Sequence, residues 1–233
     1  MSSQNPVAVV VGAGPGNGAA LTRRFAEAGY SVAALARTRQ TLDEVTKVEG
    51  VTGYLCDVAD AASVAAAFDA IRRELGDVDT LLYNAGSGVF LDIEATTPAH
   101  FEQSWRVNAF GAFLCAREII PAMKAAGRGN IVFIGATASR RGGVKTAAFA
   151  AAKAAQRSLA ESLARSLWPS GVHVSLIILD GIVDSPAARK AMPDRAPFFV
   201  KPSGVAETAY QLCRQDRSAW SFEVEARPYA ENW

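Results

Sequence analysis

One stretch near the start of the chain, Val7–Gly18 (VAVVVGAGPGNG), restricts the possible fold more than any other. The apolar run Val7–Val11 is too short for a lone helix and is mostly β-branched, which predicts a buried parallel strand. A glycine-rich loop with Gly12, Gly16 and Gly18 follows, and Ala19–Ala28 then has the pattern of a helix that ends at Gly29. Such a loop cradles a diphosphate, because the backbone can approach phosphate and the helix N-terminus offers free N–H groups. The glycines alone also fit a tight turn; their place between a strand and a helix favours the cradle.

The rest of the chain alternates between short apolar runs and helical patterns, with no linker or repeat that would divide it. We expect further strands at Tyr30–Ala36, Val51–Cys56, Asp79–Tyr83, Gly129–Gly135, Val172–Leu179 and Trp220–Glu225. We expect further helices at Thr41–Glu49, Ala61–Leu75, Pro98–Ala126, Ala147–Trp168 and Ser203–Gln215. This alternation predicts an α/β fold with a doubly wound parallel sheet and helices on both faces. Right-handed crossovers predict the order 3-2-1-4-5-6-7 in a single Rossmann domain over residues 1–233.

The composition argues against several other classes of protein. With 233 residues, half of them hydrophobic and a fifth charged, the chain can bury one sizeable core. A net charge of +1 gives no indication of nucleic acid or of an acidic membrane surface as a partner. The three cysteines, Cys56, Cys115 and Cys213, are widely separated, so we expect buried thiols, with neither a disulfide framework nor a metal site. Since no apolar run can span a membrane and the N-terminus lacks a signal-peptide pattern, we expect a cytoplasmic protein.

Two motifs point to a particular family of Rossmann proteins. Gly12, Gly16 and Gly18 have the spacing G-x-x-x-G-x-G, where the long dinucleotide-binding enzymes have G-x-G-x-x-G. The triplet Asn84-Ala85-Gly86 directly follows the fourth expected strand. With these motifs the chain resembles the short-chain dehydrogenase/reductase family over nearly its whole length. The resemblance implies an oxidoreductase that binds a nicotinamide cofactor, with the Asn84 triplet supporting the central sheet and contacting that cofactor.

The end of the second strand bears on the choice of cofactor. In a Rossmann unit this point faces the adenosine ribose, where an acidic residue binds the 2′-hydroxyl and repels a 2′-phosphate. Here the strand ends at Ala36 and is followed by Arg37 and Thr38. A cation beside a hydroxyl suits a 2′-phosphate, so the sequence favours NADP over NAD; a solvated surface arginine is the alternative. Asp57 and Val58 follow the third strand and are expected to edge the adenine.

The resemblance implies further contacts with the cofactor. Where the family has a Pro-Gly turn after the sixth strand, this chain has Asp180-Gly181. The glycine that lets the backbone reach the nicotinamide amide is kept, while a carboxylate replaces the stiff proline. In addition to the residues at the ends of the second and third strands, the expected cofactor-binding residues are Gly12, Pro15, Gly16, Asn17, Gly18, Asn84, Ala85, Gly86, Lys153, Gly181 and Val183.

The catalytic residues of the family are only partly present. The family places a Ser at the end of the fifth strand, a Tyr thirteen residues later, and a Lys four residues after the Tyr. Lys153 is present, but Phe149 stands at the Tyr position and Ala136 at the Ser position. Asn108, in the apolar context VNAFGAFL, matches the Asn that bends a helix and holds a water of the proton relay. Because acid–base catalysis is worth ~10²–10⁴-fold in rate, we expect hydride transfer by the usual route to be slow or absent.

Two interpretations of the missing hydroxyls follow. In the first, the chain is an NADP-dependent oxidoreductase that acts on a small carbonyl or alcohol with a non-standard proton donor. Thr137, Lys153 or a water ordered by Asn108 are the candidates, although Lys153 can also serve only to hold the ribose. In the second, the chain is a catalytically inactive NADP(H)-binding sensor or a partner subunit. His100 and His173, the only histidines, are expected to be structural.

Two expectations concern the substrate side and the assembly. A short substrate lid near residues 185–202 begins at Ser185-Pro186, and its shortness predicts a pocket more open than usual. The helices that carry Asn108 and Phe149 are richer in apolar residues and alanine than one sheet face requires. In the family these helices form the main interface, so the resemblance implies a homodimer or homotetramer.

Overall fold

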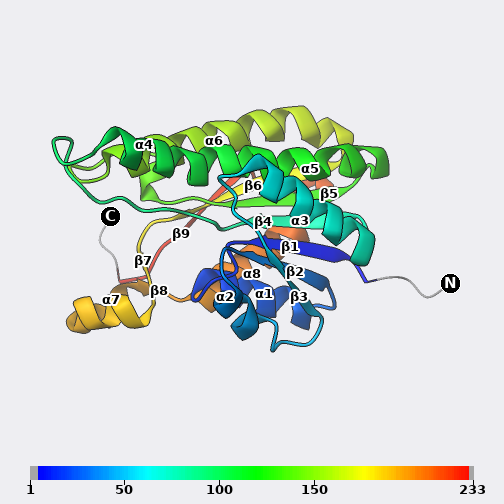
Figure 1. Ribbon diagram of the computed structural model, residues 1–233, viewed down its shortest axis with the longest axis horizontal. Helices are drawn as coiled ribbons and strands as arrows, with labels where there is room; N and C mark the ends of the chain where they lie inside the picture. Colours follow the sequence, from blue (N-terminus) through cyan, green and yellow to red (C-terminus); the bar gives the residue numbers. More distant parts are fainter. Residues whose placement is uncertain (1–4, 231–233) are drawn as a thin grey trace.

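Seven parallel strands form the centre of the molecule, in the order β3-β2-β1-β4-β5-β6-β9 (Figure 1). The structure is a computed structural model that describes residues 5–230. The strands of this sheet are β1 Val7–Val11, β2 Ser31–Ala36, β3 Val51–Leu55, β4 Val78–Tyr83, β5 Gly129–Ile134, β6 Val172–Leu179 and β9 Glu223–Ala226. The predicted order is confirmed. Its seventh position belongs to β9 because β7 (Ile182–Val183) and β8 (Phe199–Val200) form a separate two-stranded sheet.

Helices cover both faces of the sheet, as the alternating pattern predicts. They are α1 Asn17–Glu27, α2 Arg39–Val45, α3 Ala61–Glu74, α4 Pro98–Trp105, α5 Gly111–Ala126, α6 Ala147–Leu167, α7 Pro186–Ala191 and α8 Pro202–Cys213. Figure 1 shows α4, α5 and α6 along one face and α1, α2 and α8 along the other. None of the helices in residues 5–230 is long and apolar enough to cross a membrane.

The first strand shows why a continuous apolar run was needed. Val7, Val9 and Val11 point into the core cluster completed by α3, α5 and α6. Ala8 and Val10 point to the opposite face, into the cluster completed by α1 and α8. Successive side chains of a strand alternate between the two faces, so a strand covered on both sides must be apolar at every position.

The predicted helical stretch Pro98–Ala126 has a widened turn in its middle. Here α4 passes into a π-helical turn at Arg106–Phe110, which leads directly into α5. Asn108 lies in this turn and is completely buried. The phenol of Tyr83, at the end of β4, donates a hydrogen bond to the carbonyl oxygen of Val107 at 2.5 Å. A widened turn bends a helix and is frequent at functional sites, and this one is fixed to the sheet.

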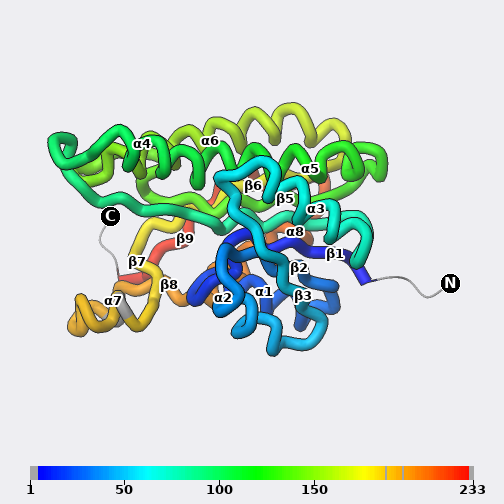
Figure 2. Tube along the Cα trace, in the orientation of Figure 1, coloured from blue at the N-terminus to red at the C-terminus, as the bar shows by residue number. Residues whose placement is uncertain are grey.

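Between β6 and α8 the chain leaves the sheet. This segment contains α7 and a 3₁₀ turn at Pro193–Phe198, and the short strands β7 and β8 pair at its base. Figure 2 shows it standing apart from the main body at one corner of the molecule. The sequence analysis did not predict β7 or β8, because two residues are too few to show any periodicity. The segment coincides with the expected lid at residues 185–202.

Candidate active site

Two adjoining cavities open at the C-terminal ends of the strands, where open α/β sheets bind their ligands. The nucleotide cavity has a volume of about 310 Å³ and lies between the ends of β1, β2 and β4. The inner cavity has a volume of about 640 Å³ and is lined from the ends of β5 and β6 and from α6. Asn84 and Gly86 line both, so the cavities meet at the triplet that follows β4.

The glycine loop packs so tightly that two of its glycines admit no side chain. A Cβ on Gly12 would lie 2.7 Å from the backbone of Ala85, and one on Gly18 only 2.2 Å from the Gly12 carbonyl oxygen. Gly16 differs, because the nearest atom to a Cβ there is a methyl of Val183 at 3.9 Å; what favours glycine at this position is its φ of +90°. Gly16 also precedes α1, whose N-terminus no side chain caps. The loop is therefore close-packed beneath and open above, which fits a diphosphate against the helix N-terminus.

The Asn84 triplet holds this loop in place. Asn84 Nδ2 donates a hydrogen bond to the Gly12 carbonyl oxygen at 2.8 Å, and the Asn84 amide donates to the Val11 carbonyl oxygen at 3.0 Å. Ala85 is the residue against which Gly12 packs, and Gly86 borders the inner cavity. The triplet that sequence analysis linked to the cofactor thus connects β4 to the loop after β1.

The far end of the nucleotide cavity carries the cation expected from the sequence. Arg37 is exposed, lines the cavity and makes no ion pair with any described residue. Thr38 also lines it, while its hydroxyl caps α2 by accepting from the Thr41 amide at 3.3 Å. Val58 lines this cavity as expected, whereas Asp57 does not and its carboxylate accepts from the Ala59 amide at 3.0 Å.

The other expected cofactor residues lie either in the glycine loop or at the inner cavity. Pro15, Gly16 and Gly18 shape the loop and line neither cavity. Asn17, Gly181 and Val183 line the inner cavity. Asn17 is almost fully buried, and its Oδ1 has no hydrogen-bond partner among the described residues. An unpartnered buried oxygen is costly, so Asn17 fits a position beside a bound polar group.

Lys153 extends from α6 into the inner cavity. Its Nζ donates to the Ile134 carbonyl oxygen at 2.8 Å and to Gln156 Oε1 at 3.1 Å. Burial lowers the pKa of Lys153 to about 7, because the charged ammonium loses its hydration. A neutral amine has two N–H groups and can still donate both bonds. A strongly shifted group in a cleft is typical of functional sites.

Gln156 and Asn108 complete a buried network behind Lys153. Gln156, one helical turn along α6, donates from Nε2 to the carbonyl oxygen of Asn108 at 3.0 Å. Asn108 Nδ2 donates to the carbonyl oxygens of Ser104 at 2.9 Å and of Ser87 at 3.0 Å. Its Oδ1 has no partner among the described residues. The bend expected at Asn108 is present, but its main-chain oxygen accepts from Gln156; that Asn108 holds a relay water stays a prediction.

The two positions without a hydroxyl both face the inner cavity. Phe149 is half-buried there, with its ring 5.4 Å from that of Phe90 between centroids. Ala136 lies opposite on the turn that follows β5, and Thr137 beside it also lines the cavity. Phe149, Ala136, Thr137 and Lys153 are thus brought together as the sequence analysis expects.

Four residues in or around the inner cavity, Arg141, Gln156, Asp180 and Arg227, were not selected as site residues by the sequence analysis. The Thr137 hydroxyl donates to Asp180 Oδ1, and Arg227 holds the other carboxylate oxygen of Asp180. Exposed Arg141 stands at the rim of the inner cavity, and Gln156 lies behind Lys153. Of these residues, only Gln156 carried a signal in the sequence, because a residue three positions after Lys153 lies on the same face of the expected helix. The contact of Thr137 with Asp180 joins residues 43 positions apart.

The histidines lie elsewhere. His100 is in the first turn of α4, where it forms a capping box with Thr97. His173 is buried in β6, stacks on Trp220, and its Nε2 lies 2.9 Å from the Ser221 carbonyl oxygen. Neither lines a cavity, in agreement with structural roles. Within residues 5–230, no cluster of three or more His, Cys, Asp or Glu side chains could hold a metal ion.

Comparison with known proteins gives the family. The sequence model for short chain dehydrogenases matches residues 6–196. The chain is 33% identical over 189 residues to 2-(R)-hydroxypropyl-CoM dehydrogenase from Xanthobacter autotrophicus, which covers 77% of this chain and 75% of that protein. A short-chain dehydrogenase from Rhodopseudomonas palustris superposes with a TM-score of 0.83 at 34% identity, over 97% of this chain and 99% of that one. A metagenomic short-chain oxidoreductase in complex with NADP gives 0.83 at 30% identity, over 99% and 100%.

The chain therefore belongs to the short-chain dehydrogenase family, whose members bind nicotinamide cofactors. The residues present fit such a cofactor. The glycine loop leaves an open cradle at the uncapped end of α1, and unpartnered buried oxygens of Asn17 and Asn108 lie beside the inner cavity.

The pKa of Lys153 leads to a test by stability. Between pH 7 and about pH 10 the unfolded chain holds the Lys153 proton and the folded protein has lost it, so this residue makes the free energy of unfolding rise with pH. Other groups titrate in the same range, and Lys153→Met removes only this contribution. We expect the free energy of unfolding of wild type minus that of Lys153→Met, measured by urea titration without cofactor, to rise across this range. Lys47→Met, at an exposed lysine, is the control and should show a flat difference. A flat difference for Lys153→Met as well would contradict the lowered pKa.

Proposed function

We propose that the protein is an NADP-dependent oxidoreductase of the short-chain type that acts on a small carbonyl or alcohol, with a proton carrier other than tyrosine. The observation that supports it most is the inner cavity, where Lys153, Thr137 and the Phe149 ring converge beside the Asn84 triplet. A bound nicotinamide supplies or accepts a hydride. The residues of this chain are left to orient the substrate oxygen and to move its proton.

Lys153 has two possible roles in this proposal. Its lowered pKa allows the Nζ to exchange a proton near neutral pH, and its position allows it to bind a ribose hydroxyl. Thr137 is the hydroxyl that stands nearest in sequence to the missing serine. Phe149 contributes an apolar ring that packs on Phe90 and shapes the cavity.

The absence of the phenol supports a second candidate, an NADP(H)-binding sensor or partner subunit without catalysis. Both candidates need the nucleotide cavity, and only the chemistry in the inner cavity separates them. The deciding experiment is a cofactor titration followed by a panel of carbonyl compounds with NADPH and of alcohols with NADP⁺. Turnover supports the oxidoreductase, and binding without turnover supports the sensor.

The choice of NADP rests on Arg37. We expect NADPH to bind more tightly than NADH, because Arg37 lies in the nucleotide cavity where an acidic residue would repel a 2′-phosphate. Arg37→Ala should weaken NADPH binding by about tenfold, a loss typical of one charge-assisted contact, and should leave NADH nearly unchanged. Calorimetric titration measures both. Arg39→Ala, an exposed arginine outside the cavity, is the matched control, and equal affinities in the wild type would contradict the assignment.

The positions of the missing hydroxyls lead to a gain-of-function test. Phe149→Tyr and Ala136→Ser together would place both family hydroxyls in the cavity that already holds Lys153. We expect the double variant to reduce carbonyl compounds with NADPH about tenfold faster than wild type, since general acid catalysis is worth ~10²–10⁴-fold. Phe149 is half-buried and overpacking costs about 1–3 kcal/mol, so thermal melting and NADPH binding are measured alongside.

The matched control for this test is Phe90→Tyr. It adds a phenol to the same cavity, on the ring that Phe149 touches, without placing it four residues before Lys153. It should not increase the rate. If a folded, NADPH-binding double variant reacts no faster than wild type with any carbonyl in the panel, the assumed correspondence with the family site is wrong.

We also propose that the protein assembles as a homodimer or homotetramer through α4, α5 and α6. Phe101, Trp105 and Phe113 are 45%, 43% and 41% exposed on the first two helices. Trp105 stacks on Phe110 at 5.4 Å between centroids, and Phe110 stacks on Phe113, which makes one aromatic strip. Exposed apolar surface of this kind is typical of an interface.

Light scattering tests the assembly. We expect a dimer or tetramer at micromolar concentration, and Trp105→Glu should shift the population toward monomer because a charge would be buried at the interface. Val144→Glu, on a loop residue that is 88% exposed, is the control and should leave the mass unchanged. A monomeric wild type would contradict the proposal.

A further inference from the structure

The Thr137 hydroxyl has its proton committed on the side away from the cavity. Its Oγ1 donates to Asp180 Oδ1, and the second acceptor within reach is the Leu179 carbonyl oxygen at 3.5 Å. A hydroxyl has one proton to donate and lone pairs that accept. Because both acceptors belong to the end of β6, what Thr137 presents to the inner cavity is an acceptor. This is the opposite of what a carbonyl substrate needs.

Asp180 is held in place from behind. Its amide donates to the Ala226 carbonyl oxygen at 3.0 Å, which continues the β6–β9 pairing by one residue. Arg227 Nη2 holds its Oδ2, so that Oδ1 is the oxygen that faces Thr137. The Asp180 and Arg227 side chains are only 16% and 14% exposed. Asp180 itself does not line the inner cavity and reaches it through Thr137.

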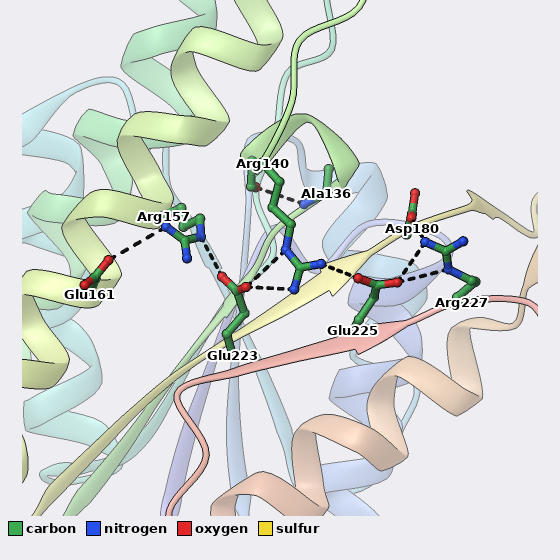
Figure 3. A network of polar contacts seen from close by, with 9 residues as sticks. Ala136, Arg140, Arg157, Glu161, Asp180, Glu223, Glu225 and Arg227 are labelled. Carbon is green, nitrogen blue, oxygen red and sulfur yellow. Dashed lines mark hydrogen bonds and ion pairs between the residues drawn. The ribbon is translucent and has the colours of Figure 1, made fainter. Parts of the chain in front are cut away.

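An ion network fixes this arrangement (Figure 3). Glu225 lies 2.8 Å from Arg227 and also pairs with Arg140, which in turn binds Glu223 at 2.7 Å. Glu223 continues the network to Arg157 on α6 at 2.6 Å. The charged groups around Asp180 are therefore Arg227 and Glu225 from the β9 side and Arg140 from the turn after β5, with Lys153 from α6 in the adjoining cavity. Alternating charges of this kind orient one another, and the network ends at Thr137.

We propose that Thr137 and Asp180 form the proton-accepting pair of this protein and that it works as a dehydrogenase of alcohols. This rests on the proposed oxidoreductase function and gives it a direction and a substrate class. Thr137 is the catalytic residue, because its Oγ1 accepts a hydrogen bond from the substrate hydroxyl. Asp180 acts through Thr137 and takes up the proton.

The reaction balances as follows. The carbinol C–H bond breaks and its electron pair leaves with the hydrogen as hydride to the nicotinamide of NADP⁺. The substrate O–H bond breaks and its proton goes to Thr137 Oγ1, while the original Thr137 proton goes to Asp180 Oδ1. The products are a carbonyl compound, NADPH and a neutral Asp180, which then releases its proton to water.

The other side of the cavity agrees with this assignment. Phe149 has no proton to exchange, and the Asn108 carbonyl oxygen already accepts from Gln156 Nε2. Lys153 Nζ donates hydrogen bonds to the Ile134 carbonyl oxygen and to Gln156 Oε1, and neither acceptor is a carboxylate that could take up a proton. Among the described residues that line the inner cavity, Thr137 is the hydroxyl that has a carboxylate behind it.

The test compares Asp180→Asn and Thr137→Val with wild type in the oxidation of 1-phenylethanol and of a panel of aliphatic and cyclic alcohols with NADP⁺. We expect both variants to lose about 100-fold in kcat, with KM and NADP⁺ affinity within about threefold, because only the proton acceptor is removed. Thr137→Ser keeps the hydroxyl and should retain most of the activity. Asp216→Asn, at a carboxylate outside this ion network and outside both cavities, is the matched control and should keep kcat within about threefold.

A binding measurement gives a readout that does not depend on turnover. In Asp180→Asn the new amide can donate to Thr137 Oγ1, which frees the Thr137 proton to point into the cavity. By saturation-transfer NMR, 1-phenylethanol in the NADPH complex should bind more weakly to this variant than to wild type. Acetophenone in the NADP⁺ complex should bind more tightly.

Each result decides the matter. Undiminished alcohol oxidation by Asp180→Asn and Thr137→Val overturns the pair and leaves the oxidoreductase function standing. A wild type that reduces ketones and oxidises no alcohol likewise overturns the Thr137–Asp180 pair and leaves the oxidoreductase function standing. A wild type that binds NADP⁺ and turns over neither class overturns the oxidoreductase function itself, and the pair falls with it. If Asp180→Asn does not fold, the comparison of Thr137→Val with Thr137→Ser, which leaves the ion network intact, still decides.

Discussion

The contact on which the rest of the site depends is the close approach of the glycine loop to the segment after β4. Gly12 packs on this segment so closely that a Cβ would lie 2.7 Å from the backbone of Ala85, and within the loop a Cβ on Gly18 would lie 2.2 Å from the Gly12 carbonyl oxygen. Asn84 then ties the two segments together through the Gly12 carbonyl oxygen. Because this contact joins the ends of β1 and β4, it sets the position of α1 and the floor of both cavities. A side chain here would separate the strands or displace the helix, and either change would remove the cradle.

Beyond that contact, the buried polar groups decide what the inner cavity can do. Lys153, Gln156 and the Asn108 carbonyl oxygen satisfy one another on the α6 side. Thr137, Asp180 and Arg227 do so on the side of β6 and β9. Buried polar groups without partners are costly, so each set is held in one arrangement. The two sets leave different polar atoms facing the cavity: the amine of Lys153 on one side and the acceptor oxygen of Thr137 on the other.

The sequence analysis predicted the parts of the protein that depend on local pattern. Apolar runs identified the strands of the main sheet, and their alternation with helices identified its order, because a strand covered on both faces must be apolar throughout. Phe149, Ala136, Thr137 and Lys153 were expected to meet, and they line one cavity. What it did not reveal depends on contacts between distant segments. The partnership of Asp180 with Thr137 spans 43 residues, and that of Asp180 with Arg227 spans 47. The carboxylate of Asp57, whose place at the adenine stays a prediction, accepts a hydrogen bond from the Ala59 amide two residues on, which the sequence pattern did not show.

The cofactor half and the chemical half of the site differ in what holds them. The first is built from backbone: glycines without a side chain, an uncapped helix N-terminus and the amide hydrogen bonds of the Asn84 triplet. The chemical half is built from side chains, and the backbone keeps its conformation there without their hydroxyl groups. Replacing a tyrosine by phenylalanine removes one oxygen and leaves a ring that packs on Phe90, and an alanine at position 136 still allows the turn that follows β5. The fold therefore tolerates exchange of side chains in this half of the site at little cost in packing, and the proposed proton route uses a hydroxyl that is hydrogen-bonded to a carboxylate. In this chain that hydroxyl belongs to Thr137.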